Sequence, residues 1–113
     1  MAFETIDFRV EDGIARLTLD RPDAANAMNM ELGRELFEAA IACDERADIR
    51  AVLLTGAGKM FSAGGDLRYF ASRGDELGAA LKELTGNLHA AIARLAQMDA
   101  PVVCAVNGMA AGA

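Results

Sequence analysis

The chain has 113 residues, enough for one domain, and 53% of them are hydrophobic, so it can build a core and is not disordered. Acidic residues outnumber basic ones by 17 to 11, and the net charge of −6 argues against nucleic-acid binding, because no basic patch offsets the repulsion of a phosphate backbone. No apolar run reaches the roughly 18 residues of a membrane span, and the N-terminus lacks the basic and apolar regions of a secretory signal. We therefore expect a cytoplasmic protein that binds neither nucleic acid nor membrane.

The first half of the chain predicts a hairpin followed by a helix. Residues 14–19 alternate apolar and polar side chains, which is typical of a half-buried strand, and residues 6–10 pair with them across a glycine-bearing turn at 11–13. A helix is expected over residues 30–46, with Asn29 as its N-cap. The apolar stripe of this helix comprises Leu32, Leu36, Ala40 and Ile41.

The second half predicts two buried strands separated by helices. Residues 51–55 and 102–106 are short, continuous apolar runs, which favour parallel strands covered on both faces. Between them, residues 60–61 begin an extended segment, 67–71 form one or two helical turns, and 75–98 carry the clearest helical periodicity. This order of elements predicts an α/β fold with parallel pairing.

Few side chains suggest a metal site or a nucleophile. Cys43 and Cys104 lie 61 residues apart without metal-type spacing, and we expect both to be buried thiols. His89, the only histidine, lies within the long helical pattern and has no ligand set nearby, so no metal is predicted and the residue is expected to be structural or exposed. Methionines are expected to fill gaps in the core: Met28, Met30, Met60, Met98 and Met109.

The end of the chain is apolar and small. Residues 109–113 carry no charge, and two strands that need cover on both faces leave few elements to supply it. We therefore expect residues 1–113 to be the N-terminal portion of a larger domain. The alternative is a compact small domain whose last strand lies at a protected edge.

Two glycine-rich turns, at residues 61–67 and 107–113, are the segments best suited to chemistry. Glycine lets the backbone approach a ligand closely, and two converging N–H groups can stabilise negative charge on a carbonyl oxygen. Each turn taken alone is more typical of a structural role.

In order along the chain, LTLDRPDAANAMN, VLLTGAGKMFSAGGDL and APVVCAVNGMAAGA resemble the enoyl-CoA hydratase/isomerase family, also called the crotonase superfamily. The resemblance covers nearly the whole chain. It implies a crotonase-like spiral of ββα units, of which residues 1–113 hold the first part of the core. It also implies an acyl-CoA thioester as substrate, no further cofactor, and assembly as a homotrimer or hexamer.

The resemblance also assigns roles to single residues. Gly65 and Ala113 correspond to the two backbone N–H donors of the oxyanion hole. Arg21 or Lys59 is placed to approach the phosphates of CoA, although exposed solubilising charges are the simpler interpretation of both. Asp66 has an alternative role as the cap of the following helix, which we favour. The predicted substrate- and CoA-binding positions are Ala25, Asn26, Ala27, Ala63, Gly64, Gly65, Asp66, Leu67 and Arg68.

Acid/base catalysis has no candidate in this sequence. The acidic residues of this chain belong to a solvated helix face or to turns. A general base must lie within hydrogen-bonding reach of the proton that it takes, and none of these residues is expected to do so. The catalytic carboxylates are therefore expected beyond residue 113, and hydratase and isomerase activity remain equally favoured. A non-catalytic acyl-CoA-binding or folding module is the alternative function.

Overall fold

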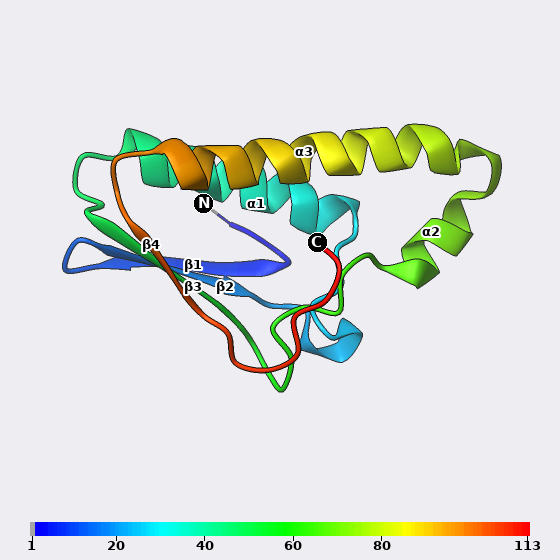
Figure 1. Ribbon diagram of the computed structural model, residues 1–113, viewed down its shortest axis with the longest axis horizontal. Coiled ribbons are helices and arrows are strands. Elements are labelled where there is room, and N and C mark those ends of the chain that lie inside the picture. Colours follow the sequence, from blue (N-terminus) through cyan, green and yellow to red (C-terminus); the bar gives the residue numbers. More distant parts are fainter. Residues whose placement is uncertain (1) are drawn as a thin grey trace.

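Four strands form one mixed sheet in the order β1-β2-β3-β4 in the computed structural model, which describes residues 2–113 (Figure 1). The hairpin prediction is confirmed: β1 (Ile6–Glu11) pairs antiparallel with β2 (Ile14–Leu19). Next to them, β3 (Ala51–Gly56) pairs parallel with β2, and β4 (Val102–Ala105) pairs parallel with β3. The α/β class with parallel pairing is therefore confirmed.

Two long helices, α1 (Met30–Glu45) and α3 (Leu77–Gln97), lie against each other on the same side of the sheet (Figure 1). The short helix α2 (Leu67–Arg73) precedes α3, and a 3-10 turn, η2 (Gly74–Glu76), joins the two. A second 3-10 turn, η1 (Pro22–Ala24), follows β2. Within residues 2–113, no helix is long and apolar enough to cross a bilayer.

The start of α1 follows the sequence prediction. Asn29 has an extended backbone, and its Oδ1 accepts a hydrogen bond from the Leu32 N–H at 2.9 Å, so it caps the helix as expected. A Cβ on Gly33 would lie 2.7 Å from Leu84 Cδ1, so a glycine here allows α1 and α3 to approach closely. One position of the expected stripe is wrong: Ile41 is 36% exposed, because the face buried against α3 and the sheet includes Ala39 and Cys43 instead.

The prediction that residues 102–106 form a strand buried on both faces is wrong. β4 is the last strand at one edge of the sheet, and of its four residues only Val102 is even half-buried. Val103 is 60% exposed, Cys104 is an exposed thiol and Met109, expected to fill the core, is 66% exposed. β3 is also less buried than predicted, since only Val52 and Gly56 are fully buried in it. The expected extended segment at residues 60–61 forms no strand.

A buried carboxylate attaches the N-terminal segment to α1. Glu35 is 6% exposed, and its Oε1 accepts hydrogen bonds from the Thr5 N–H and the Thr5 hydroxyl, both at 2.7 Å. The Glu4 N–H donates to both carboxylate oxygens. Burial alone would raise the pKa of Glu35, but these hydrogen bonds to the charged form outweigh it and lower the pKa.

Replacing Glu35 with glutamine is expected to lower the free energy of unfolding by about 1.5 kcal/mol at neutral pH, because the hydrogen bonds lose their charged acceptor. Since the folded-state pKa of Glu35 is lowered, its stabilising effect is complete above the unfolded-state pKa and disappears as the pH falls through the folded-state value. Urea denaturation at a series of pH values measures this difference. Glu38→Gln, an exposed change on the same helix, is the control. An equal effect of both substitutions at neutral pH would contradict the proposed role of Glu35.

Candidate active site

The two glycine-rich turns lie side by side. β3 and β4 are parallel neighbours, so the segments that follow these two strands leave the sheet at the same edge. An isolated parallel bridge then joins Ser62 to Ala110. Here the Ser62 N–H donates to the Met109 carbonyl oxygen at 3.2 Å, and the Ala111 N–H donates to the Ser62 carbonyl oxygen at 3.0 Å. In Figure 1, the C-terminal segment runs beside the segment that leads into α2.

Glycine is required at two positions for this close approach. Gly64 has φ +93° and Gly112 has φ +63°, both in the left-handed region that favours glycine. A Cβ on Gly64 would lie 2.9 Å from the Ala111 carbonyl oxygen, and a Cβ on Gly112 would lie 3.1 Å from the Gly64 Cα. A side chain at either position would therefore push the two turns apart.

Backbone hydrogen bonds on both sides of Gly65 fix its direction. The Met28 N–H donates to the Gly64 carbonyl oxygen at 2.7 Å, and the Asp66 N–H donates to the Met28 carbonyl oxygen at 3.0 Å. Successive peptide groups of an extended segment point to opposite sides, so the Gly65 N–H points away from Met28. Among residues 2–113, neither this N–H nor that of Ala113 has a hydrogen-bond acceptor. Both N–H groups are therefore available to a ligand.

Side-chain amides hold the loop between β3 and the first turn. Asn26 is completely buried, and its Nδ2 donates to the carbonyl oxygens of Ala57 and Met60, both at 2.9 Å. Asn107 Nδ2 donates to the Gly58 carbonyl oxygen at 3.0 Å. Asn26 precedes the first turn and Asn107 begins the second. Their hydrogen bonds to residues 57–60 therefore connect both turns to the same backbone segment.

Asp66 caps α2, as the sequence favoured. Its Oδ1 accepts from the Tyr69 N–H at 3.1 Å, and its Oδ2 accepts from Arg21 Nη1 at 3.0 Å. The side chains of Arg21 and Asp66 are 20% and 12% exposed, so the expectation that Arg21 is an exposed solubilising charge is wrong. Burial would raise the pKa of Asp66, but the hydrogen bonds from Tyr69 and Arg21 outweigh it and lower the pKa. Asp66 is therefore an anion at neutral pH, and each of its oxygens accepts a hydrogen bond.

A depression of about 700 Å³ opens beside Gly65. Six of the nine predicted substrate- and CoA-binding positions line it: Ala27, Ala63, Gly65, Asp66, Leu67 and Arg68. Leu67 is 78% exposed, which leaves a large apolar side chain at the rim. Arg21 and Tyr69 also contribute to the lining. The structure thus brings together residues from two segments far apart in the sequence.

The other three predicted positions do not line this depression. Asn26 and Gly64 are buried, and both take part in the hydrogen bonds that shape the two loops. Ala25 has a left-handed backbone with φ +53°, and its carbonyl oxygen accepts from the Ala63 N–H at 3.0 Å. Their contact with CoA stays a prediction.

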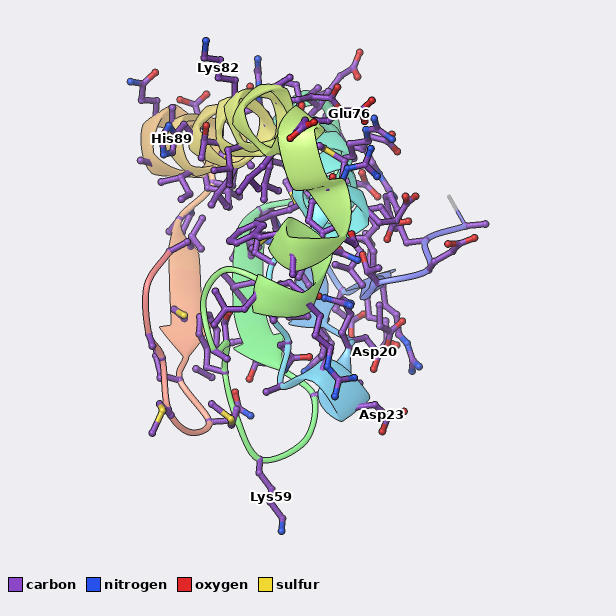
Figure 2. The ribbon with its side chains drawn as sticks, turned by 90° about the vertical axis from the view of Figure 1, so that its right-hand side faces the viewer. Asp20, Asp23, Lys59, Glu76, Lys82 and His89 are labelled. Atoms are coloured by element: carbon purple, nitrogen blue, oxygen red, sulfur yellow. The ribbon has the colours of Figure 1, made fainter. Side chains whose placement is uncertain are left out.

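The remaining candidate residues lie away from the two turns. Lys59 projects from the tip of the loop after β3, and His89 is exposed on α3, as expected (Figure 2). Glu76 and Glu83 belong to the acids expected on a solvated helix face, and both are exposed and form surface ion pairs, with Arg73 and Arg34 respectively. Within the described residues 2–113, no group of three or more His, Cys, Asp or Glu side chains is placed to hold a metal ion.

Three contributions to the site were missed by sequence reasoning. The Ser62 hydroxyl donates to the Asn26 carbonyl oxygen at 2.9 Å and accepts from the Gly64 N–H at 3.1 Å, so this buried residue shapes the first turn. Asn107 fixes the loop before that turn, and the Asn-Gly dipeptide was its only signal. The ion pair between Arg21 and Asp66 joins residues 45 positions apart and had no signal in the sequence.

Comparison with known proteins identifies the family. Residues 9–113 match the family model described as enoyl-CoA hydratase/isomerase. The chain is 40% identical over 113 residues to a probable enoyl-CoA hydratase of Rhodobacter capsulatus, and this match covers 100% of the chain and 42% of the relative. It is 41% identical over 114 residues to the 1,2-epoxyphenylacetyl-CoA isomerase of Escherichia coli, covering 97% of the chain and 42% of the relative.

Solved structures agree with the sequence matches. A Pseudomonas aeruginosa protein superposes with a TM-score of 0.85 at 39% identity, covering 92% of this chain and 44% of the other. The chain thus spans about two-fifths of the length of the curated relatives that it matches. A Legionella pneumophila protein described as an enoyl-CoA hydratase/isomerase (crotonase) superposes with a TM-score of 0.83 at 23% identity, covering 95% of this chain and 41% of the other. The crotonase-like fold expected from the resemblance is therefore confirmed for the part that the chain spans. The chain belongs to the enoyl-CoA hydratase/isomerase family.

Proposed function

We propose that the complete protein containing this chain acts on acyl-CoA thioesters by enoyl-CoA hydratase or isomerase chemistry. The observation that carries the proposal is the unpaired N–H of Gly65 beside the depression, with the turn that ends at Ala113 packed against it. Membership of the family supports this substrate class. Hydration and isomerisation share the same requirement, which is stabilisation of charge on the thioester oxygen.

In this proposal, the N–H groups of Gly65 and Ala113 donate hydrogen bonds to the thioester carbonyl oxygen. Negative charge grows on that oxygen as the thioester takes on enolate character, so the two hydrogen bonds strengthen in the transition state. Donors fixed by the surrounding backbone need little reorganisation during the reaction. One such donor contributes about 3–4 kcal/mol in comparable sites.

The acid/base groups are proposed to lie outside residues 1–113. Asp66 is the carboxylate next to Gly65 in sequence, but both its oxygens already accept hydrogen bonds from Tyr69 and Arg21. A base must be free to accept a proton from substrate or water. The lowered pKa of Asp66 also makes it a weak base, so we assign it to support of the turn and not to proton transfer.

We propose that CoA binds along the two loops beside the depression and is part of the substrate, so no separate cofactor is required. The segments concerned are residues 25–27 and 63–68. Arg68 is exposed at this rim and can meet a phosphate, whereas the guanidinium of Arg21 is already paired with Asp66. Lys59 is exposed at a loop tip and remains a second candidate for a phosphate contact.

The direct test is an assay of the full-length protein with two substrates. Hydration of a 2-enoyl-CoA removes the ultraviolet absorbance of the conjugated thioester, whereas isomerisation of a 3-enoyl-CoA creates it. Turnover of either substrate supports the proposal, and the free enoic acids are the control. Tight binding of acyl-CoA by calorimetry without turnover of either thioester would instead identify an acyl-CoA-binding module.

The 113-residue chain made alone is expected to show no turnover and to self-associate. Val103, Val106 and Met109 are 58% to 66% exposed, and apolar surface of this kind promotes association. Ala113 would also be a terminal residue, whose N–H is poorly held. Sedimentation velocity at several concentrations and a CoA-thioester assay test this. We expect the complete protein to be a homotrimer or hexamer, and a monomeric, active 113-residue chain would contradict the assignment of catalytic groups outside it.

A further inference from the structure

We propose that Arg21 is a positioning residue for the Gly65 N–H, acting through Asp66. The inference rests on the proposed role of Gly65 in binding the thioester oxygen. One guanidinium nitrogen, Arg21 Nη1, donates to the Asp66 carboxylate at 3.0 Å and also to the Ala27 carbonyl oxygen.

These two contacts lie on opposite sides of one backbone bridge. Ala27 precedes Met28, and Asp66 follows Gly65, while Met28 and Gly65 form the parallel bridge that sets the direction of the Gly65 N–H. Arg21 therefore connects the two backbone segments of the bridge through a side chain that is only 20% exposed. A shift of either segment would stretch a contact to the guanidinium.

Other hydrogen bonds hold Arg21 itself in place. Its N–H donates to Asn26 Oδ1 at 2.8 Å, and its carbonyl oxygen accepts from the N–H groups of Ala24 and Asn26, both at 2.9 Å. A side chain that starts from a fixed backbone loses little conformational freedom when it forms its contacts. The loop from Arg21 to Ala27 is therefore a rigid support for the guanidinium.

The pair has an electrostatic consequence as well. Asp66 is an anion directly after the residue whose N–H is proposed to meet a growing negative charge. An unpaired carboxylate there would oppose that charge, and a partly buried position weakens the screening by water. The Arg21 guanidinium lies 3.0 Å from the Asp66 carboxylate and compensates its charge. The Gly65 N–H can therefore still stabilise the negative charge that grows on the thioester oxygen.

The test uses the full-length protein, three single variants and one double variant. Arg21→Gln removes the charge, Arg21→Lys keeps it without the planar guanidinium, and Asp66→Asn keeps an oxygen that can accept from Tyr69 N–H. Arg46→Gln is the matched control, because Arg46 forms an exposed ion pair with Asp48 outside the site. Circular dichroism and urea denaturation verify that each variant is folded.

Kinetics separate positioning from a general loss of stability. Arg21→Gln is expected to lower kcat by about tenfold with less than about a twofold change in KM, because a misplaced donor affects the transition state most. Arg21→Lys is expected to recover part of this loss by restoring the charge. The double variant Arg21→Gln/Asp66→Asn is expected to be no worse than the poorer single variant, because both changes break the same interaction.

A spectroscopic probe reports the donor directly. An aminocinnamoyl-CoA thioester absorbs at longer wavelength when hydrogen bonds polarise its carbonyl, so the full-length protein is expected to shift its absorption to the red. Arg21→Gln is expected to bind the probe with a smaller red shift, and Arg46→Gln with the full shift. If the unmodified protein neither shifts the probe nor turns over enoyl-CoA, the proposed function and this inference both fall.

If the unmodified protein shifts the probe and folded Arg21→Gln gives the same shift and kcat, only the role of Arg21 is overturned. Loss of the fold in all three variants would also overturn it, because a purely structural ion pair then explains the contacts.

Discussion

Turnover of an enoyl-CoA by the full-length protein is expected to fall by roughly 10²- to 10³-fold when Gly65 is replaced with proline. Proline has no backbone N–H, so the substitution removes the proposed oxyanion donor itself. The hydrogen bonds that hold the neighbouring peptide groups use the Gly64 carbonyl oxygen and the Asp66 N–H, and proline at position 65 leaves both in place. The substitution therefore removes the donor without removing a partner of either hydrogen bond in the bridge to Met28.

Alanine at the same position is the matched control. A Cβ on Gly65 would lie 2.7 Å from the ring of Phe70, so both substitutions require the same adjustment of that side chain. Gly65→Ala retains the N–H, and its loss of turnover is expected to be much smaller than that of Gly65→Pro. Steady-state kinetics on both variants, with circular dichroism to verify folding, decides the matter. Equal losses would assign the effect to the Phe70 contact and remove the N–H from the mechanism.

The positions of the two glycine-rich turns could be predicted because their causes are local. A glycine-rich segment after a short apolar run marks a turn after a strand, and parallel strands bring such turns to the same edge of a sheet. The caps of α1 and α2 also have local causes, since Asn29 and Asp66 each accept a hydrogen bond three residues further along the chain. These features were therefore visible in short stretches of sequence.

Burial and long-range pairing could not be predicted in the same way. The apolar run at Val102–Ala105 has the composition of a covered strand, yet its exposure depends on which elements lie on either side of it in space. Nothing near Arg21 in the sequence indicates that its guanidinium reaches Asp66. Asn26 was placed in a CoA-binding loop by resemblance, whereas its buried amide holds the loop at Ala57 and Met60. Such contacts arise only once the loops are assembled.

Gly108 lies where the second turn meets the loop that carries the first. A Cβ on Gly108 would lie 2.0 Å from the Lys59 carbonyl oxygen and 3.2 Å from the Met60 Cα, so the backbone itself would have to move. Gly108→Ala is therefore expected to lower the free energy of unfolding by about 3 kcal/mol, at the upper end of the usual cost of overpacking. Urea denaturation of the full-length protein measures this change.

The same chemical change at Gly86 is expected to have the opposite sign. Gly86 lies within α3, and a Cβ there would meet no atom within 4 Å, so Gly86→Ala gains up to about 1 kcal/mol from the greater helix propensity of alanine. Destabilisation at both positions would show that the contact with Lys59 is not the cause at Gly108. The pair of variants thus distinguishes a specific backbone collision from a general intolerance of alanine.

The effect of Gly108→Ala should extend from stability to turnover. Met109, the next residue, accepts hydrogen bonds at its carbonyl oxygen from the N–H groups of Phe61 and Ser62, at 3.0 and 3.2 Å. When the Lys59 backbone is displaced, these bonds lengthen and the turn that ends at Ala113 moves away from the turn at Gly65. Two N–H groups can bind one oxygen only if they converge, so kcat is expected to fall even at temperatures where the variant remains folded. A folded Gly108→Ala variant with unchanged kcat would mean that the two turns do not act on the same atom.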